Sequence, residues 1–197
     1  FCVETGLSAV GMTRYRRELS LDSALAKVSF SKDGVDYKRE FFVSYPANVM
    51  AVRFSASRGG KQDLRLSYVP NPVSTGKMTA DGADALCWTA WLDNNGMEYV
   101  VRVKAMAKGG TVANSDGKIT VRGADEVVLL ITADTDYRAN YDPDFNDPKA
   151  YVGVDPAQTT AGWIKKAAAK GYDGLLGEHL ADYSSLFAKV KLDINEA

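Results

Sequence analysis

Hydrophobic and polar residues alternate along most of the first two thirds of the chain. Over residues 35–45, "VDYKREFFVSY", the alternation is typical of a β-strand with one buried face. The residues expected on that face are Val35, Tyr37, Phe41, Val43 and Tyr45. Residues 24–31 alternate in the same way, and "KDG" between the two segments predicts a tight turn, because Asp–Gly readily adopts positive φ. The pattern therefore predicts a β-hairpin over residues 24–45.

Six further segments are typical of strands. They are residues 48–56, 63–69, 85–93, 97–107, 118–123 and 126–133. The last, "EVVLLITA", has the continuous apolar run of a strand buried on both faces. "PNP" at 70–72 ends one strand and "NNG" at 94–96 predicts another turn. Strands at such short spacing favour a mainly β fold, an antiparallel sandwich, over a βαβ fold.

The pattern changes after residue 133. Residues 134–157 form a polar segment with three prolines, which we expect to be a functional or interface loop, because loops of this length are uncommon inside compact domains. Two helices should follow, over residues 158–171 and 172–190. Thr159 or Thr160 is expected to cap the first helix, and Gly171 to end it.

Composition and charge exclude some functions. The 24 Lys and Arg nearly balance the 25 Asp and Glu, so the net charge of -1 argues against nucleic-acid binding, which needs an excess of cations. No apolar run reaches the roughly 18 residues of a membrane span. Cys2 and Cys87 have no metal-ligand spacing, and they are either two thiols or one bridge. No cofactor is expected.

His179 is the only histidine, and it lies beside the apolar positions of the second expected helix. Asp182 is three residues further on and Tyr183 follows it, so Asp182 is spaced to orient the histidine. No serine or cysteine lies in a context that would complete a triad, and none of the acidic residues is singled out as a glycosidase pair. We therefore assign no catalytic residue and expect His179, Asp182 and Tyr183 to be structural.

Two other groups are candidate binding sites. Asp142, Asp144 and Asn146 have the spacing that opens a calcium loop, but the Gly and Glu that should follow are absent, which favours a rigid Asp-capped loop without a metal. The second group surrounds an amide-rich turn and suits a sugar contact through aromatic faces and amides. Its members are Trp88, Trp91, Asn94 and Asn95. Because Trp88 and Trp91 are three residues apart, they should point to opposite faces of a strand.

The chain resembles the N-terminal domain of glycoside hydrolase family 95, the α-L-fucosidase type. The resemblance begins at residues 15–56, which include the "SYP" corner, and continues through "GYDGLLGEHLADYSSLFAKVKLDI" at 171–194. It implies a β-supersandwich domain over residues 1–157, with strands that precede residue 1 in the family. It also implies a two-helix linker segment over residues 158–191 that leads to a catalytic (α/α)6 barrel. After the helices, the residues "KLDI" at 191–194 themselves resume strand-like alternation.

The resemblance implies a function for the chain as part of a larger enzyme. We expect a non-catalytic domain that supports the barrel of the same polypeptide, in an inverting enzyme that acts on glycans with α-L-fucosides or related α-L-galactosides. The setting it implies is periplasmic or secreted. The alternatives are an autonomous carbohydrate-binding module and an interaction domain that docks through the loop 134–157.

Overall fold

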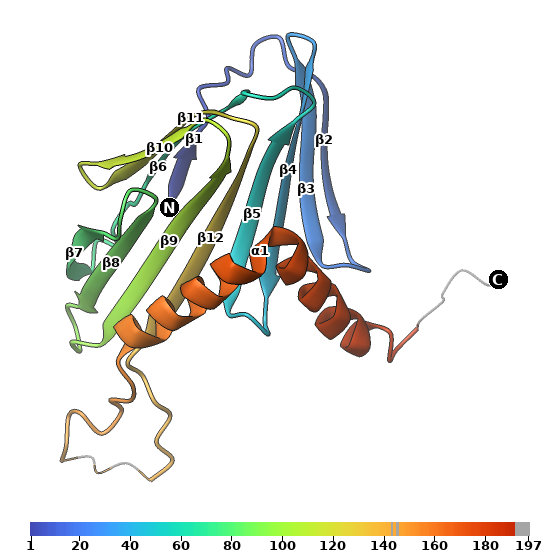
Figure 1. Cartoon of the computed structure of the whole chain (residues 1–197). Coiled ribbons are helices and arrows are strands. Elements are labelled where there is room, and N and C mark those ends of the chain that lie inside the picture. The colour runs from blue at the N-terminus through green and yellow to red at the C-terminus, as the bar shows by residue number, and fades with distance from the viewer. Residues whose placement is uncertain (143, 145, 192–197) are drawn as a thin grey trace.

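The computed structural model describes residues 1–142, 144 and 146–191 as two antiparallel β-sheets and one long helix (Figure 1). The smaller sheet has the order β1 (Cys2–Glu4), β6 (Gln62–Ser67), β11 (Lys118–Ala124), β10 (Thr111–Ser115). The larger sheet has the order β2 (Thr13–Ser20), β3 (Leu25–Lys32), β4 (Val35–Ser44), β5 (Val49–Ala56), β12 (Glu126–Thr135), β9 (Glu98–Lys108), β8 (Ala85–Leu92), β7 (Ser74–Ala80). The helix α1 spans Pro156–Phe187. The expectation of a mainly β, antiparallel sandwich is confirmed.

The four strands that alternation does not reveal are the four sheet edges. β1 and β10 border the small sheet, and β2 and β7 border the large one. None of the four contains a buried residue. Hydrophobic and polar residues alternate in a strand because one of its faces is buried. An edge strand that is exposed on both faces therefore shows little alternation. The eight strands found from the sequence are the interior ones.

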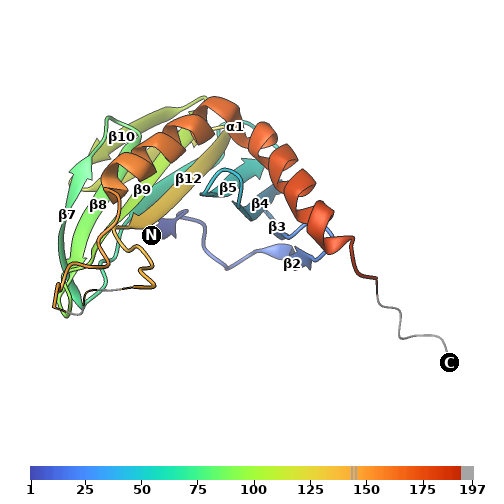
Figure 2. The same ribbon diagram turned by 90° about the horizontal axis from the view of Figure 1, so that it is seen from below.

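The large sheet is covered on both faces, by different partners. The small sheet covers its inter-sheet face, where Val52, Leu86, Val103 and Leu129 are buried among the side chains of the first core. The helix covers the other face, which we call the helix face (Figure 2). The members of this second core include Phe42, Val49, Ala51, Val128, Leu130, Ile164, Tyr172 and Leu175. β12 contributes to both cores, and four consecutive residues from Val127 to Leu130 are buried, as the apolar run predicts.

The expected buried face of β4 is wrong at its C-terminal end. Val43 and Tyr45 are exposed, whereas Phe42 and Ser44 are buried. The helix packs against the helix face at this end of the strand, while the small sheet does not reach the inter-sheet face there. Burial therefore changes sides within one strand.

The helix begins at a residue other than the expected N-cap, but it bends at the expected Gly171. Asp155 is the N-cap, and its Oδ1 accepts a hydrogen bond from the Ala157 amide at 2.8 Å. Thr160 instead lies buried, where its hydroxyl receives a hydrogen bond from Arg102 Nε at 3.1 Å. The two expected helices form one element with a kink at Gly171, whose φ of 72° and ψ of 172° are not helical. The strand-like "KLDI" lies mostly outside the described residues.

A buried ion-pair cluster lies beneath the kink. Glu40 of β4 is only 3% exposed, and its carboxylate is paired with Arg53 and, at 2.7 Å, with Lys38. The Arg53 guanidinium also lies 4.1 Å from the centre of the Tyr172 ring, directly after the kink. Burial alone would raise the pKa of Glu40, but the hydrogen bonds from Lys38 and Arg53 outweigh it, so the pKa lies below its ordinary value.

Replacing Gly171 should destabilise the chain through backbone strain alone. No atom lies within 4 Å of a Cβ added there, but an L side chain rarely adopts its φ. We expect Gly171→Ala to lower the free energy of unfolding by about 1–3 kcal/mol in urea titrations. Gly177→Ala is the matched control, because it lies in regular helix with open space and should stabilise by about 0.5–1 kcal/mol. Equal effects of the two changes would contradict a strained kink.

The Glu40 cluster should make stability depend on acid pH. A carboxyl whose pKa is lowered on folding stabilises the folded state at pH values above its unfolded pKa of about 4.3. This stabilisation is lost as the pH falls through the folded pKa. Glu40→Gln should therefore cost about 2–3 kcal/mol at pH 7, and the difference from the parent should shrink steadily as the pH falls below about 4. The control Glu18→Gln removes an exposed pair with Arg16 and should cost at most about 1 kcal/mol at any pH. If the loss of stability in Glu40→Gln did not depend on pH, the shape of the side chain rather than its charge would stabilise the cluster.

Candidate functional site

The two ends of the sandwich differ in their exposed side chains. The end that is lowest in Figure 1, which we call the loop end, carries the turns 45–48, 68–73 and 93–97 and the loop 136–155. Exposed large apolar side chains at or beside it are Val43, Tyr45, Val69, Val73, Trp91, Tyr137, Tyr141, Val152 and Val154. Tyr45 is 80% exposed and Tyr141 is 98% exposed.

The opposite end is polar. Its turns are short and built from glycine and charged residues, such as Asp33–Gly34 and Asp116–Gly117, which all have positive φ. Val10 is the one exposed large apolar side chain that the described part of the chain places there. Large apolar patches on a protein surface mark interaction sites, and aromatic residues are enriched in interfaces. The loop end is therefore the candidate functional surface.

The loop 136–155 is held against the rest of this end. Tyr137 and Val152 form a β-bridge at its base, and the Arg138 amide donates to the Tyr151 carbonyl at 2.6 Å. The Tyr151 hydroxyl donates to the carbonyl oxygen of Asn95 at 3.0 Å, which ties the loop to the β8–β9 turn. The loop and the turn thus form one continuous surface.

A hollow of about 550 Å³ opens at the loop end between the two sheets. We call it the mouth hollow. The large sheet lines it with Leu92, Tyr99 and Thr135, and the segment after β6 lines it with Tyr68 and Asn71. Burial and the neighbouring Tyr99 hydroxyl raise the pKa of Tyr68 to about 12, so this hydroxyl stays protonated at neutral pH.

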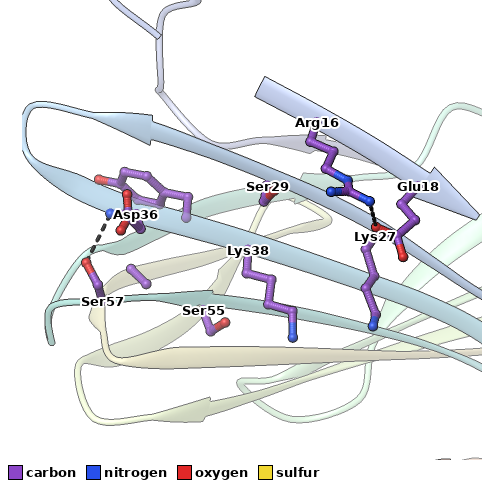
Figure 3. A pocket seen from close by; sticks show the side chains of 10 residues that line it. Arg16, Glu18, Lys27, Ser29, Asp36, Lys38, Ser55 and Ser57 are labelled. Carbon is purple, nitrogen blue, oxygen red and sulfur yellow. Dashed lines mark hydrogen bonds and ion pairs between the residues drawn. The ribbon is translucent and has the colours of Figure 1, made fainter. Parts of the chain in front are cut away.

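A second hollow, of about 410 Å³, lies on the helix face of β2 to β5 (Figure 3). Its two carboxylates are each paired with an arginine: Glu18 with Arg16 at 2.8 Å, and Asp36 with Arg14 at 2.6 Å. Neither carboxylate of this hollow is left without a cationic partner among the described residues.

The structure places two of the three expected structural residues against the sheet. His179 is buried, stacks on Phe42 at a ring distance of 4.9 Å, and donates from Nε2 to the Ser23 carbonyl at 2.9 Å. The Tyr183 hydroxyl donates to the Leu21 carbonyl at 2.5 Å. Both bonds join the second half of α1 to the β2–β3 turn. Asp182 uses its backbone carbonyl, which accepts from Ser185, and does not orient the histidine.

The four candidate sugar contacts do not form one surface. Trp88 is buried on the inter-sheet face, while Trp91 is 42% exposed on the helix face. Asn95 accepts a hydrogen bond from Met97 within its own turn, and Asn94 is exposed. Tyr68, which the sequence does not single out, and Tyr99 are aromatic residues that meet Trp88.

The calcium candidate has one carboxylate engaged in a turn. Asp144 Oδ1 accepts from the Asn146 amide at 2.9 Å, whereas Asp142 takes part through its backbone amide, which donates to Asn140 Oδ1 at 3.1 Å. Over the described residues, which omit 143 and 145, no three His, Cys, Asp or Glu gather as a metal site. In the same part of the chain, no helix is long and apolar enough to cross a membrane. Both cysteines are free thiols, Cys2 exposed and Cys87 buried.

The chain is thus an antiparallel β-sandwich with a trailing helix and one end rich in exposed apolar side chains. Residues 5–140 match the family model described as "Glycosyl hydrolase family 65, N-terminal domain", and the chain belongs to this family. The resemblance to the N-terminal domain of a fucosidase-type enzyme is thereby confirmed.

Sequence relatives agree with this family. The chain is 30% identical to "Alpha-L-fucosidase 2" from Arabidopsis thaliana over 92% of its own length and 24% of the relative. It is 28% identical to "Probable alpha-fucosidase A" from Aspergillus niger over 91% of its length and 23% of the relative. The chain thus spans about a quarter of these relatives.

A solved structure shares the fold. The chain matches the structure named "Putative kojibiose phosphorylase from human microbiome" with a TM-score of 0.61 and 10% identity. The match covers 94% of this chain and 27% of that one.

His179 should contribute to stability in a way that Asp182 does not. His179→Ala removes the stacking on Phe42 and leaves the Ser23 carbonyl without its donor, so we expect a loss of about 2–4 kcal/mol in urea unfolding. Asp182→Ala should change the stability by less than about 0.5 kcal/mol. A larger loss for Asp182 than for His179 would mean that the contacts at this turn do not hold the helix.

Proposed function

We propose that this chain is the non-catalytic N-terminal domain of a family 95 glycoside hydrolase acting on α-L-fucosides or related α-L-galactosides. It docks the catalytic (α/α)6 barrel of the same polypeptide through the loop end. The observation that carries the proposal is the gathering of exposed aromatic and aliphatic side chains at that end. The sequence relatives, about four times longer and named as fucosidases, support the substrate class.

The ion pairs of the second hollow, on the helix face, and of the buried Glu40 cluster support a non-catalytic role. The carboxylates of Glu18 and Asp36 are paired with arginines, and Glu40 is buried between two cations. A general acid needs a carboxyl that is protonated near neutral pH, whereas Lys38 and Arg53 lower the pKa of Glu40. We assign catalysis to the barrel. The family resemblance also supports a periplasmic or secreted setting.

Activity and stability measurements on a polypeptide of the relatives' length test the proposal. The long polypeptide should hydrolyse an aryl α-L-fucoside, and residues 1–197 should not. In the long polypeptide, Val43→Ser and Tyr45→Ser should each lower the free energy of unfolding by about 1–2 kcal/mol, because they remove buried interface area.

The 197-residue chain is the control for the same substitutions. Both side chains are exposed in it, so the changes should have little effect on its unfolding. Val10→Ser, at the polar end, should have little effect in either protein. Hydrolysis by the chain alone, or equal effects at both ends of the sandwich, would contradict the proposal.

A further inference from the structure

The mouth hollow combines apolar surface with fixed polar groups. Leu92 and Met97 supply aliphatic surface, and the rings of Tyr68 and Tyr99 supply aromatic surface. Its volume of about 550 Å³ lies within the range of roughly 300–1,000 Å³ that small-molecule sites occupy. The hollow is therefore large enough for a small ligand rather than for water alone.

A chain of hydrogen bonds behind the hollow sets the direction of its hydroxyl groups. Trp88 Nε1 donates to the Tyr99 hydroxyl at 3.2 Å, the Tyr99 and Ser74 hydroxyls are 2.7 Å apart, and the Ser74 hydroxyl donates to the Asn71 carbonyl at 2.9 Å. An indole N–H can only donate and a carbonyl can only accept. The Tyr99 hydroxyl must therefore donate to Ser74, and only its oxygen is left to receive a further donor.

Other groups in the hollow supply a donor and an acceptor. The Tyr68 hydroxyl stays protonated, with a pKa of about 12, and its hydrogen bond with Tyr99 leaves the Tyr68 oxygen to accept from a ligand. The side-chain oxygen of Asn71 accepts from the Val73 amide at 3.2 Å, which leaves the side-chain amide N–H groups for a ligand. A ligand would thus meet donors at Asn71 and an acceptor at Tyr68.

The charges of the hollow disfavour an anionic ligand. Among the described residues that line it there is no lysine or arginine, so an anion would find no counter-charge. The one carboxylate, of Asp134, has Oδ1 bonded to the Thr135 amide at 2.9 Å. A neutral ligand with hydroxyl groups of both polarities and a C–H face fits this set.

We propose that the mouth hollow is a binding site for a neutral saccharide unit, with its C–H face on Leu92 and Tyr99 and its hydroxyls on Tyr68 and Asn71. The site differs from the Trp91 and Asn94–Asn95 turn. It does not rest on the proposed docking role, because the chain by itself contains all of it.

Titration of the isotope-labelled 197-residue chain with L-fucose, and in parallel with L-galactose and D-glucose, tests this site by amide NMR. We expect saturable shifts at Asn71, Met97, Tyr99 and Thr135 with a dissociation constant in the millimolar range for at least one sugar. Tyr99→Phe breaks the hydrogen-bond chain and should weaken binding at least about fivefold. Asn71→Ala is the second variant, because Asn71 is exposed and the change spares the core.

Trp91→Ala is the matched control, an exposed aromatic at the same end but outside the hollow, and it should leave the affinity unchanged. Absence of saturable shifts with all three sugars, or shifts centred on Trp91 and Asn95, would overturn the site. So would unchanged affinity in both Tyr99→Phe and Asn71→Ala. Because the titration uses the chain alone, either failure leaves the docking proposal standing.

Discussion

Burial of the central strands of the large sheet on both faces is the constraint on which the rest of the structure depends. β12 is buried over four consecutive residues, Val127 to Leu130, which face the small sheet and the helix in turn. Such a strand is stable only if both coverings are present, since exposing either set of side chains would cost hydrophobic free energy. The helix is therefore part of the core of this domain. The kink at Gly171 and the contacts of His179 hold the helix across the strands of the large sheet.

The same arrangement explains why the two ends of the sandwich differ. The small sheet and the helix are both packed within the domain. The turns at the polar end consist of glycine and charged residues. At the loop end, Tyr45, Trp91 and Tyr141 extend beyond both layers into solvent. Side chains of this kind gain free energy from a partner, whereas the polar turns do not. The loop end is therefore the surface through which such a domain can contact the rest of a longer polypeptide. The mouth hollow lies in this surface.

The sequence correctly predicts the interior strands and the break at Gly171. Burial of one strand face and the backbone freedom of glycine each leave a pattern among residues that are close in the chain. Sequence reasoning fails at the four edge strands, where exposure removes the alternation, and at Val43, where the helix takes over the covering of β4. It correctly predicts that Trp88 and Trp91 point to opposite faces of one strand. The loop end and the mouth hollow are assembled by topology from segments far apart in the chain, so no local pattern reveals them.

Hydrogen–deuterium exchange tests the central claim, that the loop end docks the remainder of the polypeptide, most directly. The exchange of the 197-residue chain is compared with that of the same residues in a polypeptide of the relatives' length. The account predicts slower exchange in the long polypeptide at residues 45–48, 93–97 and 137–141. The turns 33–34 and 116–117 should exchange equally in both. Unchanged exchange at the loop end, or protection at the polar end instead, would contradict it.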